Sequence, residues 1–142
     1  MKKILSAFAV LALSVAQAQA AAGFSCETAE NEKPKFVVEG ATPRSGGTLI
    51  NFGAVLEIEG RKIEFQQADV KRYYGVGGVI QVRVSKAAEG QTYTVYVNAK
   101  RNQKDEDEWF GTYELTVASA DTKAKTKTAA TKKRGNVKCF VD

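Results

Sequence analysis

The sequence predicts an all-β protein: a single-domain antiparallel meander, closed as a small barrel or a two-sheet sandwich, with its N- and C-terminal strands tied by a disulfide. Apolar and polar residues alternate from Phe36 to Val117, which is the period of a half-buried strand. Short turn signals separate the alternating runs, and the two cysteines, Cys26 and Cys139, lie near the ends of the 142-residue chain. Strands that are apolar on one side must close a barrel or pack as two sheets to bury that side.

The first twenty residues read as a targeting segment. A positively charged start is followed by an apolar run over 4–16 and by the small-x-small motif Ala18-Gln19-Ala20. This pattern predicts a signal peptide over 1–20, and its short, alanine-rich form is typical of bacterial export. The apolar run is shorter than the roughly 20 residues of a spanning helix. We therefore expect residues 21–142 to form a periplasmic or secreted domain with no membrane span.

Export decides how the two cysteines are interpreted. In an oxidising compartment Cys26 and Cys139 are expected to pair, and no other connectivity exists. Neither cysteine belongs to a CxxC motif or has a histidine that lowers its pKa, so a structural bridge is favoured over a reactive thiol. We expect the bridge to tie an early strand, with Phe36 and Val38, to a last strand at the seam of the barrel. The last strand contains Val137, Cys139 and Val141.

Three hairpins can be registered on the alternation. In the first, the apolar face of 50–58, from Ile50 to Ile58, continues across a two-residue Glu59-Gly60 turn onto Ile63 and Phe65. In the second, a loop over 87–90 pairs Val84 with Tyr93, Val82 with Val95 and Ile80 with Val97. In the third, a polar loop over 101–108 pairs Val97 with Tyr113, Val95 with Leu115, Thr94 with Thr116 and Tyr96 with Glu114.

Composition argues against an enzyme. The chain has no histidine, which excludes Ser-His and Cys-His dyads, the zincin motif and the two-His-one-carboxylate iron site. Two cysteines cannot complete a structural zinc site. A glycosidase acid needs a carboxyl group raised in pKa by burial, and on the registers above the strand carboxylates face solvent. These are Glu57, Glu59, Glu64 and Glu114. We therefore expect no catalytic residue, no metal and no cofactor.

The positive charge of the chain is concentrated near its C-terminus. Residues 121–142 hold seven basic and two acidic side chains, whereas residues 21–120 are slightly acidic. We predict a basic low-complexity loop over 121–136, tethered at both ends. It is either a solvated loop or an anion-binding strip, and the alternation over 123–127 also fits an edge strand protected by lysine. Its candidate anion-binding residues are Lys123, Lys125, Lys127, Lys132, Lys133 and Arg134. The loop contains no aromatic residue on which bases could stack, so nucleic acid is not an expected partner.

Two other groups of residues could bind a partner. The run over 71–78 offers Lys71, Arg72, Tyr73, Tyr74 and three glycines, either as a binding loop or as a glycine-rich bend with one tyrosine inward and the other outward. Tyr96 and Phe110 are aromatic residues on the solvent-facing side of the predicted sheet, and they would form one patch only if the fold places them together.

Two polar segments are better explained as turns. Residues 44–48 could form an anion-binding nest, but Pro43 before them favours a turn. The acidic run over 105–108 lacks the glycine of a calcium-binding loop, so we expect a solvated hairpin tip.

Cysteines at both ends of a small β-domain are similar to those of the small periplasmic lysozyme-inhibitor barrels. The resemblance implies the same kind of fold and is an analogy at the level of the fold alone. We therefore expect an exported, non-catalytic binding or inhibitor-like module that acts on a protein or a cell-envelope component. The alternative is a structural envelope protein held to anionic polymers or lipid headgroups through its Lys-rich loop.

Overall fold

The computed structural model describes residues 21–43, 49–106, 108–119 and 130–141. These residues form nine β-strands and one short 3₁₀ helix. In chain order the elements are β1 (Ala21–Thr28), β2 (Lys35–Pro43), β3 (Ile50–Ile58), β4 (Arg61–Gln66), η1 (Gln67–Asp69), β5 (Val70–Val76), β6 (Val79–Ala88), β7 (Gln91–Arg101), β8 (Trp109–Ser119) and β9 (Thr131–Val141). The predicted signal peptide, the 44–48 turn and Lys123, Lys125 and Lys127 lie outside the described residues.

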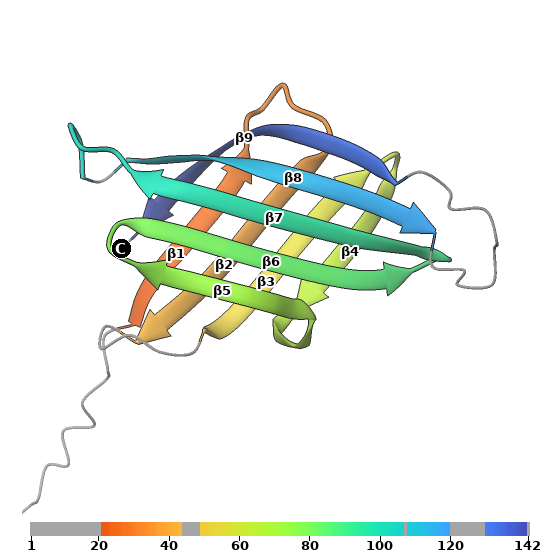
Figure 1. The fold of residues 1–142 in the computed structure, drawn as a ribbon, viewed down its shortest axis with the longest axis horizontal. Helices are drawn as coiled ribbons and strands as arrows, with labels where there is room; N and C mark the ends of the chain where they lie inside the picture. Colours follow the sequence, from red (N-terminus) through yellow and green to blue (C-terminus); the bar gives the residue numbers. More distant parts are fainter. Residues whose placement is uncertain (1–20, 44–48, 107, 120–129, 142) are drawn as a thin grey trace, which may run out of the picture.

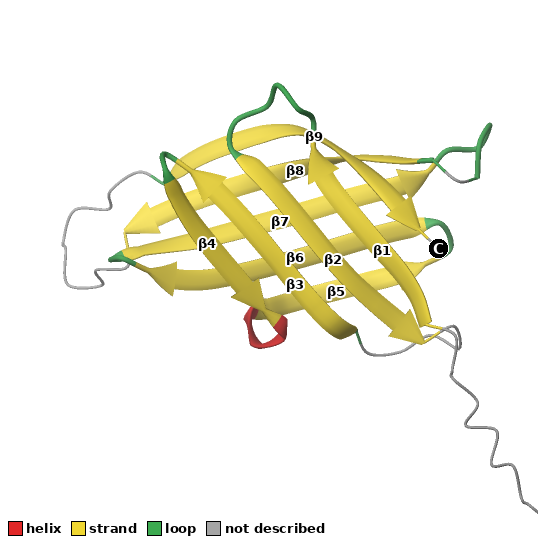
Figure 2. Cartoon of the chain, turned by 180° about the vertical axis from the view of Figure 1, so that it is seen from behind, coloured by secondary structure: helices red, strands yellow, loops and turns green. Residues whose placement is uncertain are grey.

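All nine strands belong to one antiparallel sheet in the order β4-β3-β2-β1-β9-β8-β7-β6-β5. The sheet curls into a nearly closed barrel, with β5 to β8 crossing in front of β1 to β4 (Figure 1) and the same layers seen from behind in Figure 2. The all-β meander predicted from the sequence is therefore confirmed, and it takes the barrel form. Strands β4 and β5 are the two edges of the sheet, and the seam of the barrel lies between them.

The barrel is filled by the inward-facing side chains of all its strands. Every second residue of each strand points inward, because successive side chains alternate between the two faces. The largest fully buried ones are Tyr93, Phe36, Phe65, Leu56, Leu115, Val38, Val82, Val84, Val95 and Val97. The rings of Phe36 and Phe65 meet edge to face with their centroids 6.3 Å apart.

The first hairpin has the predicted turn and register. Leu56 pairs with Ile63 across the Glu59-Gly60 turn, whose residues both have positive φ. The inward placement of Ile50 is wrong. Asn51 has a φ of 51° and the pairing of β2 with β3 shifts beside it, which is the mark of a β-bulge. As a result Ile50 is 37% exposed and Leu49 is buried in its place.

The second hairpin has the predicted faces but a different register. Its turn contains two residues, Glu89 and Gly90, with φ values of 50° and 75°, rather than the four-residue loop expected over 87–90. Both values suit a type I′ turn, which matches the twist of the strands. The register is therefore moved by two residues, and the observed pairs are Val84 with Val95, Val82 with Val97 and Ile80 with Ala99.

In the third hairpin all four predicted pairs are confirmed. Strands β7 and β8 pair Val97 with Tyr113, Val95 with Leu115, Thr94 with Thr116 and Tyr96 with Glu114. The run of alternating residues is longest here, so the apolar pattern has little freedom to slip.

The predicted disulfide is present. Cys26 and Cys139 lie directly opposite each other on β1 and β9, with their Cα atoms 4.0 Å apart, and both side chains are fully buried. Strands β1 and β9 are hydrogen-bonded neighbours, so the bridge does not lie at the seam as expected. Phe36 and Val38 lie on β2, one strand away from the bridge.

A side chain bridges the seam where β4 and β5 do not pair: the ammonium group of Lys86 on β6 donates to the Glu64 carbonyl on β4 at 2.7 Å. At the end of β4, the Asp69 carboxylate of η1 accepts from the backbone N–H of Gln66 at 2.8 Å. These contacts occupy polar groups of the β4 backbone that an added strand would otherwise use.

The C-terminal strand is longer than the sequence suggested. The basic loop predicted over 121–136 is wrong for 131–136, because β9 begins at Thr131 and pairs with β8 from Val117 to Trp109. Polar side chains on both faces of this part of β9 hid its strand character. Lys132, Lys133 and Arg134 therefore have fixed backbone positions.

Candidate functional site

The run of cationic and aromatic residues on β5 is divided between the two faces of the barrel wall. Tyr73 points inward and its ring stacks on Phe24, with centroids 5.9 Å apart, whereas Tyr74 is exposed. Gly77 and Gly78 form the turn to β6, with φ values of 66° and 78°. The prediction of one tyrosine inward and the other outward is confirmed, and the glycine-rich bend is a hairpin turn.

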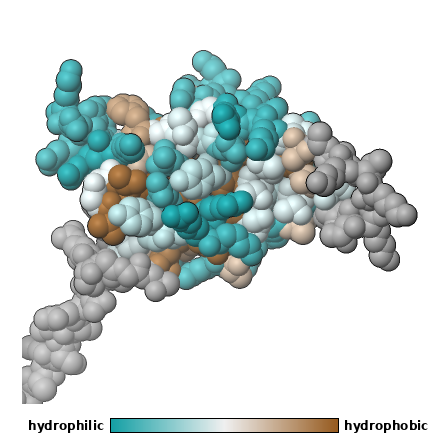
Figure 3. Space-filling view, viewed as in Figure 1, coloured by the Kyte–Doolittle hydropathy of each residue, from teal (hydrophilic) through white to brown (hydrophobic). Residues whose placement is uncertain are grey.

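Arg72 and Tyr96 lie on one outer face. Cross-strand pairing places Arg72, Arg83, Tyr96, Glu114 and Arg134 in a single row across β5 to β9. The Nε atom of Arg134 is 2.8 Å from Glu114 Oε2. Polar side chains cover most of this face in Figure 3. It is a flat polar surface, and Phe110 is not part of it because it pairs with Lys100, four residues along β7 from Tyr96.

Phe110 belongs instead to a groove of about 570 Å³ on the outer face of β8, β9, β1 and β2. Pairing aligns Phe110 with Lys138, Glu27 and Val37, and Phe140 lies one row away on β9. Phe110 and Phe140 are each about half exposed, and Val37 is also exposed. We call this the phenylalanine groove.

The phenylalanine groove carries both signs of charge. Glu27 and Glu30 line it together with Lys35 and Lys138. Lys138 and Glu27 lie between Phe110 and Val37 in the cross-strand row. The Nζ atom of Lys138 lies 5.4 Å from the centroid of the Phe140 ring, within the range of a cation–π contact. Exposed aromatic side chains among charged groups are typical of a surface that binds another protein.

Sequence reasoning identified Phe110 but missed Phe140, Lys138, Val37 and Glu27. The inward placement of Val137, Cys139 and Val141 already implies that Lys138 and Phe140 face outward. Their meeting with Phe110 and Val37 depends on β9 pairing with both β8 and β1, which local alternation does not reveal.

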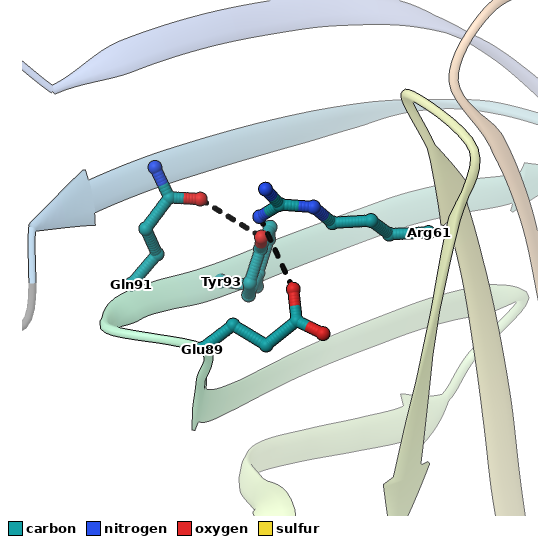
Figure 4. A network of polar contacts seen from close by, with 4 residues as sticks. All are labelled: Arg61, Glu89, Gln91 and Tyr93. Carbon is teal, nitrogen blue, oxygen red and sulfur yellow. Dashed lines mark hydrogen bonds and ion pairs between the residues drawn. The ribbon is translucent and has the colours of Figure 1, made fainter.

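A polar network occupies the barrel end at which β3 turns into β4 and β6 into β7. Figure 4 shows Arg61 of β4 beside Glu89, Gln91 and Tyr93. Arg61 Nη1 is 3.2 Å from Glu89 Oε2, and the Tyr93 hydroxyl donates to Gln91 Oε1 at 2.9 Å. A hydrogen bond with Tyr93 and the nearby Glu89 carboxylate raise the pKa of Arg61 above its usual value. Arg61 is therefore a permanent cation at this end.

A second groove, of about 560 Å³, lies at the same end of the barrel. Its walls come from the β1–β2 loop, the β3–β4 turn and the start of β9. We call it the lysine groove after its four lysines, Lys33, Lys35, Lys62 and Lys133. Of these four lysines, Lys133 alone was predicted from the sequence to bind an anion.

The predicted anion-binding strip is divided by β9. Lys133 lines the lysine groove, whereas Arg134 points to the outer face and pairs with Glu114. Lys132 is exposed and pairs with Thr116 in the sheet. In the described part of the chain, Lys132, Lys133 and Arg134 therefore do not form one continuous strip.

The carboxylates named in the sequence analysis are all at least partly exposed. Glu57, Glu59 and Glu64 are exposed and Glu114 is partly exposed, each on the expected polar face. Asp107 lies outside the described residues. Among the residues that are described, no group of three or more potential metal ligands is found, no cysteine is free, and no helix has the length and apolar character needed to span a bilayer.

Comparison of the chain with protein-family models, with curated proteins and with solved structures found no match.

Proposed function

We propose that the protein is an exported, non-catalytic binding module that recognises another protein through the phenylalanine groove. The single observation that carries this proposal is one groove that is lined by the exposed side chains of Phe110, Phe140 and Val37 together with charged side chains of both signs. A half-exposed phenylalanine buries further apolar area when a partner covers it, which stabilises the complex by about 25 cal/mol per Å². The partner that fits is a protein segment with an apolar side chain flanked by charges of both signs.

Three further observations support a binding role over catalysis. The chain has no histidine, and the strand carboxylates Glu57, Glu59 and Glu64 are exposed, without the burial that would make one of them a general acid. The disulfide joins the neighbouring strands β1 and β9, which carry half of the groove. A rigid surface loses little conformational entropy on binding. The export pattern of residues 1–20 supports an encounter in the periplasm or outside the cell.

The test immobilises the oxidised mature domain and measures which protein it captures from an envelope extract of the producing bacterium. The Phe110→Ser/Phe140→Ser variant removes two half-exposed rings, each of which can gain about half of the roughly 1.5–3 kcal/mol of full burial when a partner covers it. Capture of the partner is therefore expected to fall at least about tenfold. Val76→Ser is the matched control, because Val76 is 61% exposed and lies outside the groove. It should capture the same protein as wild type.

High salt separates recognition from charge. In about 1 M salt the Debye length falls to about 3 Å, so capture through the phenylalanine groove should persist. Equal capture of the partner by Phe110→Ser/Phe140→Ser and by Val76→Ser would contradict the proposal. Loss of capture by the wild-type domain at high salt would also contradict it.

The alternative function is attachment to anionic envelope polymers or lipid headgroups through Lys123 to Arg134. The exposure of Lys132 and Lys133 at the start of β9 favours it. Each lysine near an anionic surface contributes about 1 kcal/mol, and this contribution is screened by salt. This alternative therefore predicts release of the domain from envelope fractions as salt is raised, with no effect of the phenylalanine substitutions.

A further inference from the structure

The lysine groove collects positive charge from three parts of the chain that are distant in sequence. Lys33 and Lys35 come from the end of the β1–β2 loop and the start of β2, Lys62 from β4, and Lys133 from β9. Their side chains line one concave surface of about 560 Å³, a volume within the range of pockets that hold small ligands.

The charges in the lysine groove are only partly balanced by the protein, and Glu57 is the cross-strand neighbour of both Lys35 and Lys62. Five cationic side chains line it, against the two carboxylates Glu57 and Glu59. Arg61 is paired with Glu89, whereas neither of the ion pairs found in the described residues involves the four lysines. Like charges held around one concavity repel each other, and a bound anion relieves that repulsion.

The wall that carries Lys33 is held in place. Both carboxylate oxygens of Glu32 accept from the backbone N–H of Asn136, at 3.0 and 3.2 Å, and the backbone N–H of Glu32 donates to the Ala29 carbonyl at 2.9 Å. Gly135 leaves room for this carboxylate, because a Cβ atom there would collide with Glu32 and Tyr113. Pro34, which directly follows Lys33, is buried. The backbone that carries the lysines is therefore ordered before a ligand binds.

We propose that the lysine groove binds a discrete polyanion built of linked phosphoryl groups. Ammonium groups act as point charges that can meet phosphate oxygens from any direction. A chain of phosphoryl groups carries several charges and can meet lysines on all three walls at once. The groove is concave, with Pro34 and Ile58 also in its lining, so it fits a molecule that enters it rather than a flat lipid surface.

Titration calorimetry of the mature, oxidised domain with inorganic tripolyphosphate tests this site. Lys33→Gln/Lys62→Gln removes two groove charges and is expected to weaken binding at least about tenfold, since a hydrogen bond to a charged group contributes more than a factor of ten. Lys100→Gln/Lys104→Gln removes the same charge at positions outside the groove lining and should bind as wild type does. Weaker binding by Lys33→Gln/Lys62→Gln, together with unchanged binding by Lys100→Gln/Lys104→Gln, would support the proposed site.

Three outcomes would overturn the proposal. Equal weakening by the two double variants would mean that only the overall charge matters. Equal affinity for citrate would remove the phosphoryl preference. Binding to phosphatidylglycerol vesicles without binding to tripolyphosphate would replace the discrete site with a membrane surface. The inference does not depend on the phenylalanine groove, because Phe110→Ser/Phe140→Ser should leave tripolyphosphate binding unchanged.

Discussion

Strand glycines in this barrel meet different surroundings, and Gly111 and Gly53 show the extremes. A Cβ atom on Gly111 would collide with the Asn98 carbonyl oxygen and lie 2.6 Å from the Ala99 Cα, both in the backbone of β7. A Cβ atom on Gly53 would have nothing within 4 Å. Both positions hold glycine in the sequence, so only the packing around each one distinguishes a required glycine from a replaceable one.

We expect Gly111→Ala to destabilise the domain by about 1–3 kcal/mol, because the backbone of β7 must move to admit the methyl group. Gly53→Ala should be neutral or stabilise by about 0.4–1 kcal/mol, because alanine restricts the unfolded chain. Urea unfolding of both variants measures the difference. A Gly111→Ala variant as stable as Gly53→Ala would show that the β7–β8 packing yields easily.

Burial of Tyr73 makes stability depend on alkaline pH. Burial raises the pKa of Tyr73, and a hydrogen bond with Thr42 partly opposes the rise. A tyrosine titrates near pH 10 in the unfolded chain. The contribution of neutral Tyr73 is therefore complete below about pH 10 and is lost as the pH rises through the higher pKa of the folded state.

Unfolding midpoints measured across this range should show the effect. Wild type is expected to lose stability more steeply above about pH 10 than Tyr73→Phe, and the two curves should run parallel below that pH. Tyr74→Phe, on the exposed neighbour, is the matched control and should follow wild type. Parallel curves for wild type and Tyr73→Phe at every pH would remove Tyr73 as the cause.

At the scale of elements, the hairpins show what alternation can and cannot specify. The first and third hairpins have the predicted registers because their turn or their long apolar run admits one arrangement. The second hairpin is shifted by two residues, and such a shift leaves every side chain on its original face. Its register depends on the turn at Glu89 and Gly90, where positive φ values allow a two-residue connection.

The β3–β4 turn allows this dependence on φ to be tested. Glu59 has a φ of 49° and Gly60 a φ of 75°, and asparagine tolerates such values better than glutamate. Glu59→Asn is expected to stabilise the domain by a few tenths of a kcal/mol, and Gly60→Ala to destabilise it by about 1–2 kcal/mol. Thermal unfolding would report both. Destabilisation by Glu59→Asn would contradict the turn assignment.

At the scale of the whole molecule, the disulfide and the seam restrain the barrel at different places. The Cys26–Cys139 bridge joins two strands that are already paired, and its sequence separation of 113 residues makes it a strong restraint on the unfolded chain. The seam between β4 and β5 has no such link in the described chain and relies on contacts such as Lys86 with the Glu64 carbonyl. Opening of the barrel should therefore begin at the seam.

Reduction of the bridge should lower the free energy of unfolding by up to about 4.7 kcal/mol, the chain-entropy value for a loop of about 100 residues. Urea unfolding of the oxidised and reduced wild-type domain measures this without changing a side chain. Cys26→Ser/Cys139→Ser should be at least as unstable as the reduced protein, because it also places hydroxyl groups in the core. An unchanged urea midpoint on reduction would show that the bridge does not restrain the unfolded state.

The sequence by itself determined the fold class, the inward faces of most strands and the pairing of the cysteines, because these depend on local alternation and on there being two cysteines. It also indicated Phe110 as an outward aromatic residue. Only the tertiary structure decided where the seam lies, which register the second hairpin takes, and which residues meet in the two grooves. Lys33, Lys62 and Lys133 converge because β2, β4 and β9 begin on the same side of the nearly closed barrel. That convergence follows from the order of strands around the barrel, which alternation along the chain does not encode.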